Sequence, residues 1–124
     1  MTRLSIVVLM QKDPQRMEAS LVPILQHRPA DAEVIVVLNG PYEDPYDLSD
    51  EVEFVRAPRR ASWVRSATVG LQHCRGEVVN LISSGAEVTE GWTEDVLPLF
   101  DNPSIASVSP LLRDVDPSSD VQCA

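Results

Sequence analysis

Four arginines gather in the segment RAPRRASWVR, residues 56–65, which carries four of the ten lysine and arginine residues in a chain of 124. Guanidinium groups bind phosphate oxygens through paired hydrogen bonds, and Ser62 can cap a helix whose first amides and positive dipole end attract the same anions. Arg59 and Arg60 are the candidates for holding a diphosphate. An acidic run at residues 43–53 comes just before this segment, so ion pairing between the two on the surface is the simpler interpretation, and recognition of a partner is a third.

Two further polar groups follow apolar runs of the sequence. Asn39 comes after one run, and its amide can donate and accept hydrogen bonds, although its simpler role is that of a turn residue before Gly40. Ser83, Ser84 and Gly85 come after another run and can line a pocket as a neutral loop. A serine hydroxyl is a weak ligand for a hard cation and glycine supplies only backbone, so we expect no divalent metal there.

The remaining titratable side chains show no arrangement that would support catalysis or metal binding. Glu87 and Glu90 are isolated carboxylates of the kind usually found on a solvated surface, and His27 stands alone. His73 is next to Cys74, but adjacent helical residues point about 100 degrees apart and do not face each other. The sequence contains neither a G-x-S-x-G turn nor a glycine-rich phosphate loop, and we assign no catalytic residue.

Composition and charge narrow the choice of partners and location. A formal net charge of -9 repels a phosphate backbone, which argues against nucleic acid as a partner. The apolar run Leu4–Met10 is far shorter than a membrane span, and no signal-peptide cleavage site follows it. Cys74 and Cys123 have the spacing of neither a zinc site nor a disulfide framework, so we expect a soluble cytoplasmic protein.

Short apolar runs and capping signals predict alternating strands and helices. Runs rich in β-branched residues predict strands at residues 4–10, 33–40, 52–55, 77–82 and 105–108. Asp13 and Pro14 predict the start of a first helix, in which Pro23 should cause a kink or a break near residues 19–22. Its expected inward face consists of Met17, Leu21, Ile24 and Leu25.

Two more helical segments follow. Ser62 can cap the first of them, with Gly76 as a left-handed cap just past its end. A short helical segment is expected at residues 92–100, where Trp92, Val96, Leu97 and Phe100 recur at helical spacing. The expected inward face of the helix that follows Ser62 consists of Trp63, Val64, Ala67, Leu71 and Cys74.

This order of elements predicts an α/β fold: a three-layer α/β/α, Rossmann-like open sheet with mostly parallel strands. We expect one domain over residues 1–112 and a polar C-terminal tail over residues 113–124, of which residues 114–124 are polar enough to be disordered in isolation. Ligands of such sheets bind beyond the carboxyl ends of the strands. The expected ligand edge therefore consists of residues 10–13, 38–40, 57–60 and 82–87.

With its elements placed, the chain resembles the nucleotide-binding half of a family 2 glycosyltransferase, which has the GT-A fold of nucleotide-diphospho-sugar transferases. The order and spacing of the segments carry the resemblance over about residues 4–112, since each motif alone is weak. The matching segments are LSIVVLMQKD, EVIVVLNG, GLQHCRGEVVNLIS and AEVTEGWTEDVLPLFDNPSIASVSPLL.

The departures from that family bear directly on function. The resemblance places Ser83 and Gly85 where the family has the two carboxylates of its metal-binding DxD motif, and Leu38 where it has an acidic residue before Asn39. The family's acceptor-binding half, with its catalytic base, has no counterpart after residue 112. The resemblance therefore implies a domain that binds a nucleotide-diphosphate sugar through Asn39, Arg59, Arg60 and the loop Ser83–Gly85, and that is inactive or metal-independent.

A second interpretation belongs to a different class of function. The same fold can serve as a non-catalytic interaction or self-assembly module, a pseudoenzyme. A sheet without the family's second half should leave apolar surface uncovered, which a homo-oligomer would bury. A third reading makes the sequence part of a longer chain that supplies the rest of an enzyme.

Overall fold

A computed structural model describes residues 2–109, 111–113 and 121–123, with side chains described up to residue 109. The chain divides into two compact units, residues 1–92 and residues 93–124. The first unit contains one parallel sheet and both α-helices, so it carries the predicted fold and every candidate site residue.

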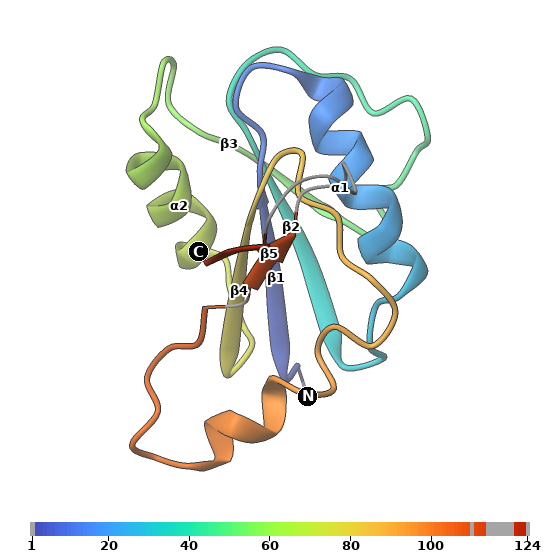
Figure 1. The fold of residues 1–124 in the computed structure, drawn as a ribbon. Helices are drawn as coiled ribbons and strands as arrows, with labels where there is room; N and C mark the ends of the chain where they lie inside the picture. The colour runs from blue at the N-terminus through green and yellow to red at the C-terminus, as the bar shows by residue number, and fades with distance from the viewer. Residues whose placement is uncertain (1, 110, 114–120, 124) are drawn as a thin grey trace. The chain divides into compact units, whose positions relative to one another are not determined.

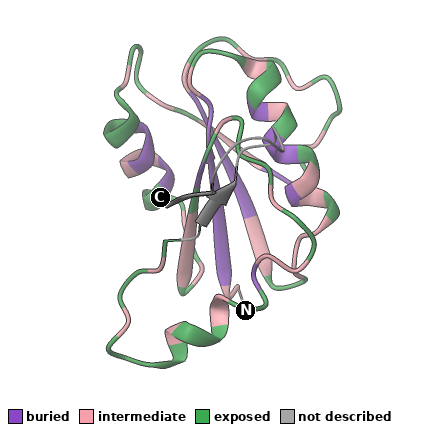
Figure 2. Cartoon of the chain, viewed as in Figure 1, coloured by how far each residue is buried: buried purple, intermediate pink, exposed green. Residues whose placement is uncertain are grey.

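The sheet of the first unit has four strands, all parallel, in the order β3-β2-β1-β4 (Figure 1). The central strands β1 and β2 are apolar on both alternating faces and almost wholly buried (Figure 2), as expected for strands covered on either side. The strands are β1 (Leu4–Leu9), β2 (Ala32–Leu38), β3 (Glu53–Arg56) and β4 (Val78–Ser83), close to the predicted bounds.

The two α-helices cover opposite faces of this sheet (Figure 1), so the predicted three-layer α/β arrangement is confirmed. Helix α1 (Pro14–Gln26) begins as predicted, with the Asp13 side chain accepting from the Gln15 amide. The break expected near residues 19–22 is wrong, because α1 continues through Pro23. Helix α1 buries apolar side chains both before and after this proline, and their packing holds the helix on the sheet. These side chains are Met17, Leu21 and Ile24.

Helix α2 (Trp63–Gln72) packs on the other face, but through smaller residues than predicted. It buries Ser66, Ala67 and Gly70. A β carbon at Gly70 would lie only 2.6 Å from Val7 Cγ1 and 2.9 Å from Val37 Cγ2, so the missing side chain lets the helix approach the sheet closely. The predicted inward face is therefore wrong at Trp63, Val64 and Leu71, whose side chains are exposed.

Gly76 also has a role other than the predicted one. Its backbone is not left-handed, and α2 ends instead with His73 as its C-cap. A β carbon at Gly76 would lie 2.7 Å from the Ser5 amide nitrogen and 2.8 Å from the Leu4 carbonyl carbon. Glycine is needed here because two backbone segments meet, and the Gly76 amide donates to Ser5 Oγ over 2.8 Å.

The second unit differs from the prediction in three ways. A single 3₁₀ helix, η1 (Leu97–Asp101), replaces the helical segment expected at 92–100, with Pro98 in its first turn. Residues 105–108 form no strand. A strand pair that was not predicted is present, because β5 (Leu111–Arg113) pairs antiparallel with β6 (Val121–Cys123), while residues 114–120 and 124 lie outside the described residues.

The helices of the described residues are all too short or too polar to reach across a lipid bilayer.

The loop between β2 and β3 contains a titratable group that gives a test of the packing. The Tyr42 ring lies 5.8 Å from the Phe54 ring, and its buried hydroxyl has no hydrogen-bond partner among the described residues. Burial raises the pKa of Tyr42 from 10.0 to about 12, with the charges of Glu18 and Asp44 adding to the shift. An unfolded tyrosine therefore loses its proton at lower pH than the folded one.

We expect the stability contributed by this protonated tyrosine to be complete below pH 10.0 and to decline as the pH rises to about 12. Urea denaturation across this pH range measures the decline. The Tyr42→Phe variant keeps the ring contact and has no proton to lose, so its stability should fall less steeply with pH. Parallel slopes for the two proteins would contradict the assignment.

Candidate functional site

The predicted ligand edge is formed where the parallel strands end together. Leu9 of β1 is in register with Val37 of β2 and with Ser83 of β4, and Leu38 is in register with Arg56 of β3. The loops that follow these strands therefore begin at one edge of the sheet. They carry Asn39, Arg59, Arg60, Ser83, Ser84 and Gly85.

The arginine loop between β3 and α2 is held at both ends. The Ala57 amide donates to the Leu38 carbonyl over 2.9 Å, and Asn39 Nδ2 donates to the Ala61 carbonyl over 2.8 Å. Ser62 Oγ then accepts from the Arg65 amide over 3.1 Å, which confirms Ser62 as the N-cap of α2. Asn39 thus uses one amide hydrogen to fix the loop, and its backbone is not in the left-handed conformation that the turn interpretation allowed for.

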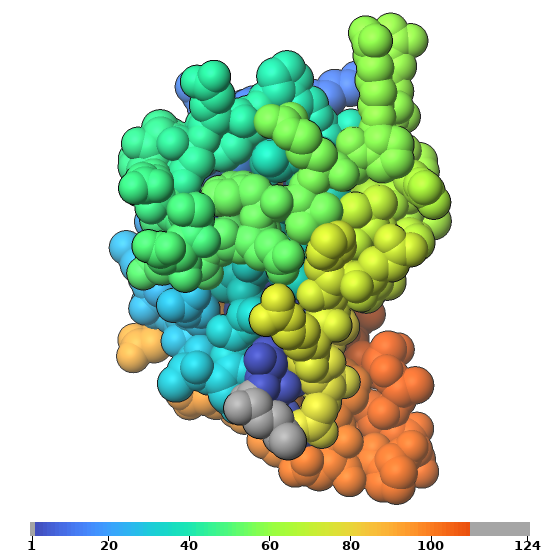
Figure 3. Space-filling view, turned by 180° about the vertical axis from the view of Figure 1, so that it is seen from behind, coloured from blue at the N-terminus to red at the C-terminus, as the bar shows by residue number. Residues whose placement is uncertain are grey.

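The arginines of this loop are free of the ion pairs that the simpler interpretation predicted. Within the described part of the chain, Arg59, Arg60 and Arg65 form no salt bridge, and all three are exposed. Arg56 donates instead to the Gly40 and Tyr42 carbonyls, each over 3.4 Å. The loop projects from the surface of the molecule (Figure 3), so its charges face solvent.

Arg60 adopts an unusual backbone conformation. Its φ of 57° lies in the left-handed region, which costs a residue with a side chain about 1 to 2 kcal/mol. Asparagine and glycine accept this conformation more readily. A substitution of Arg60 by asparagine can therefore remove the charge without straining the loop further.

The serine loop after β4 is fastened to its neighbours by hydrogen bonds. Ser83 Oγ accepts from Trp63 Nε1 of α2 over 3.1 Å, and Ser84 Oγ donates to the Leu9 carbonyl over 2.5 Å. The Gly85 amide donates to Ser20 Oγ of α1 over 2.8 Å. These contacts tie the loop to β1 and to both helices, so the two serine hydroxyls serve the structure of the loop.

A side chain that sequence reasoning missed lies over this loop. The guanidinium of Arg16, in the first turn of α1, lies against Gly85, so that a β carbon at Gly85 would be 3.0 Å from Arg16 Nη2 and 3.2 Å from Nε. The only sequence signal for Arg16 is its place shortly after the first strand. Its contact depends on the loop after β4 folding back onto α1, which the local pattern does not reveal.

These residues do not fit a divalent cation. Both serine hydroxyls already have partners, Gly85 offers no carboxylate, and a positive guanidinium occupies the adjacent space. The described residues contain no group of three acidic, histidine or cysteine side chains arranged to hold a metal ion. Glu87 and Glu90 are exposed on the loop that follows. The described residues of this edge therefore include positively charged side chains but no set of ligands suited to a divalent metal.

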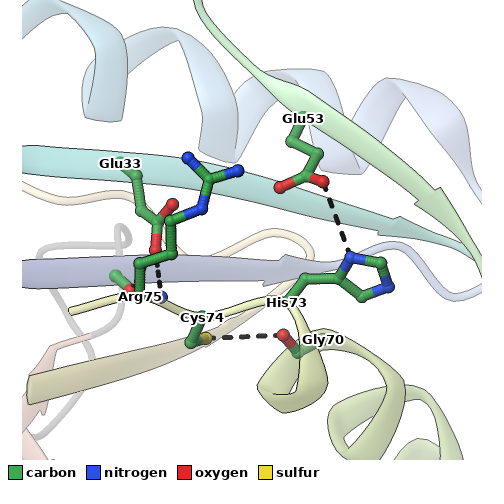
Figure 4. A network of polar contacts seen from close by, with 7 residues as sticks. Glu33, Glu53, Gly70, His73, Cys74 and Arg75 are labelled. Carbon is green, nitrogen blue, oxygen red and sulfur yellow. Dashed lines mark hydrogen bonds and ion pairs between the residues drawn. The ribbon is translucent and has the colours of Figure 1, made fainter.

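A second polar cluster lies at the opposite, amino end of the strands (Figure 4). Glu33 accepts from Ser5 Oγ over 2.5 Å and from the Arg75 amide over 2.6 Å, and His73 Nδ1 lies 3.5 Å from Glu53 Oε1. An open groove of about 440 Å³ runs beside these residues. Glu33 and Glu53 of this cluster contact residues 73–75, so they hold the segment between α2 and β4 to the sheet. The arginines of the carboxyl edge make no such ion pairs in the described part of the chain.

The fold and this edge define an α/β open-sheet protein with exposed arginines at the carboxyl edge of its sheet. No family model matches the chain. It is 29% identical over 70 residues to a protein of Drosophila melanogaster described as a putative polypeptide N-acetylgalactosaminyltransferase 9. The match covers 56% of this chain but 11% of that protein, so the chain is a distant and partial relative of a glycosyltransferase.

Proposed function

We propose that this chain is a glycosyltransferase-like domain that binds a nucleotide-diphosphate sugar at the carboxyl edge of its sheet, without a divalent cation. The observation that carries the proposal is the set of exposed arginines at that edge, Arg59, Arg60 and Arg65, which have no ion-pair partner in the described part of the chain. A diphosphate supplies the missing negative charge through paired hydrogen bonds.

The roles within this site follow from the groups that remain free. Arg59 and Arg60 bind the diphosphate, and the first turn of α2 adds backbone amides. Asn39 keeps its amide oxygen for a base edge, since Nδ2 donates to Ala61. Ser83, Ser84 and Gly85 line the site through their backbone and a firmly held loop. We assign no catalytic residue, and the proposed domain has no transfer activity on its own.

The donor is open to direct measurement. The Drosophila relative is described as acting with N-acetylgalactosamine, so a nucleotide-diphosphate N-acetylgalactosamine belongs in the set of ligands. Calorimetric titration with UDP, GDP and their sugars should give dissociation constants below about 1 mM, equal with and without manganese. Weaker binding under both conditions would reject the proposed ligand.

Removing a charge at Arg60 gives a sharper test. The Arg60→Asn variant should bind UDP about tenfold more weakly, because a charged hydrogen bond to phosphate is worth about 1.5 kcal/mol or more. Its melting temperature should equal or exceed that of the wild type, since asparagine tolerates the left-handed backbone. Unchanged affinity in this variant would remove Arg60 from the site.

A different function is favoured by one feature of the surface. Val64 and Leu71 on α2 and Leu81 on β4 are exposed apolar side chains, and β4 is the last strand at its edge of the four-stranded sheet. A non-catalytic self-assembly module would use such an edge to bind a second copy. Light scattering at high protein concentration separates the two functions, because a strict monomer counts against assembly.

A further inference from the structure

Arg16 occupies a position that bears on how the site neutralises its ligand. The Gly85 amide donates both to the Arg16 carbonyl over 3.2 Å and to Ser20 Oγ over 2.8 Å. The Arg16 guanidinium then lies against Gly85, with Nη2 only 3.0 Å from where a β carbon would stand. Backbone and side chain of Arg16 therefore both contact the residue that the family resemblance matches to a metal-binding carboxylate.

The surroundings leave the charge of Arg16 available to a ligand. Its side chain is exposed, and its guanidinium forms no ion pair within the described part of the chain. Ser20, which fixes the loop beneath it, is 0% exposed. The loop is held a second time by Ser84, whose amide and hydroxyl both donate to the Leu9 carbonyl. The hydrogen-bonded loop therefore lies against a solvent-facing guanidinium beyond the carboxyl ends of β1 and β4.

We propose that the Arg16 guanidinium is the resident positive charge that binds the diphosphate of the ligand in place of a divalent cation. The inference rests on the proposed function and adds a binding residue that the family resemblance does not supply. In a metal site, two carboxylates attract a cation that in turn binds phosphate. Here the glycine leaves room for a guanidinium that binds phosphate directly and does not lose its proton in proteins.

This arrangement has two consequences that differ from those of a metal site. Affinity for a diphosphate does not depend on added divalent ions, and chelators have no effect on it. Affinity falls with ionic strength, because the attraction is between an exposed guanidinium and phosphate oxygens. A carboxylate introduced at position 85 would meet the Arg16 charge and leave no open coordination position for a metal.

The test compares two arginines at opposite ends of the sheet. UDP and inorganic pyrophosphate are titrated into the wild type, Arg16→Gln and Arg75→Gln, with manganese and with a chelator. Both variants lose one positive charge from an exposed arginine, but Arg75 lies at the amino end beside Glu33. We expect Arg16→Gln to weaken both ligands about tenfold, Arg16→Lys to weaken them less, and Arg75→Gln to leave them unchanged.

The outcomes separate this inference from the function on which it rests. If the wild type binds UDP and pyrophosphate but Arg16→Gln binds them equally well, the role of Arg16 is refuted and the proposed function stands. Binding that appears only with manganese also overturns the inference. If the wild type binds neither ligand nor any nucleotide-sugar, the proposed function itself fails. Thermal melting of Arg16→Gln, expected to match the wild type, excludes loss of binding through unfolding.

Discussion

The Gly76→Ala variant is expected to lose about 3 kcal/mol or more of its free energy of unfolding, a large fraction of the stability of a single domain. The added methyl group would lie 2.7 Å from the Ser5 amide nitrogen and 2.8 Å from the Leu4 carbonyl carbon. Both atoms belong to the backbone of the buried strand β1, which cannot move aside without breaking its ladders to β2 and β4. Urea denaturation followed by circular dichroism measures the loss.

A second glycine provides the comparison for this variant. In Gly70→Ala the new methyl group meets only the side-chain methyls of Val7 and Val37, and alanine is the better helix former by about 1 kcal/mol. We therefore expect a smaller loss than at Gly76. Combining Gly70→Ala with Val7→Ala should cost less than the sum of the two single losses, because the second change makes room for the first. A Gly76→Ala protein as stable as the wild type would show that the close backbone contact does not exist.

The Glu33→Ala variant is expected to lose about 2 to 3 kcal/mol. Glu33 accepts short hydrogen bonds from Ser5 Oγ and from the Arg75 amide, and Ser5 Oγ in turn accepts from Gly76. Removing the carboxylate leaves two donors without their acceptor beside a buried strand, and hydrogen bonds to a charged group contribute about 1.5 to 3 kcal/mol. The loop that joins α2 to β4 depends on these contacts (Figure 4).

Two variants show whether this loss comes from the acceptor or from the charge. Glu33→Gln keeps one acceptor oxygen and should lose about half as much stability as Glu33→Ala. Glu53→Ala removes a carboxylate of the same region that lies 3.5 Å from the exposed His73 ring, and it should cost less than about 1 kcal/mol. Equal losses for Glu33→Ala and Glu53→Ala would mean that the Glu33 network adds nothing beyond surface charge.

The strands and caps of the first unit followed from local sequence because each has a local physical cause. Runs that are apolar on both alternating faces are typical of strands buried on both sides, and β1 and β2 are such strands apart from Ser5 and Glu33. Asp13 and Ser62 cap their helices through hydrogen bonds within a few residues. The packing face of α2 could not be predicted in this way. Hydrophobic spacing predicted Ala67 correctly but also favoured the large residues of the helix, whereas close approach to the sheet selected Ser66 and Gly70.

The second unit shows where apolar runs alone mislead. Residues 105–108 form a short, largely apolar run of the kind that predicts a strand, yet the pairing strand of this unit is β5, a few residues later. A three- or four-residue strand is decided by its partner, and β5 has that partner in β6. The apolar run alone therefore did not determine where the strand forms.

The sequence predicted which edge of the sheet carries the candidate site, but it did not predict the contacts that the side chains make there. Parallel strands in an α/β order bring their carboxyl ends together, so Asn39, the arginine loop and the serine loop were expected at one edge. Charge in sequence order suggested that the arginines pair with the acidic run before them. Instead, Asp44 accepts hydrogen bonds from the backbone amides of Tyr46 and Leu48. Arg56 donates to the backbone carbonyls of Gly40 and Tyr42, so both charged side chains bind the backbone of the loop between β2 and β3.

The central position of β1 in the sheet affects folding during synthesis as well as the stability of the folded chain. Residue 4 pairs with residue 32 on one side and with residue 78 on the other, so one edge of the first strand stays open until the ribosome has released most of the unit. During that interval a strand of six apolar or small residues is exposed as a template for any extended peptide. Synthesis of this protein should therefore depend on chaperones that bind nascent apolar segments, and slowing translation before residue 78 should increase aggregation.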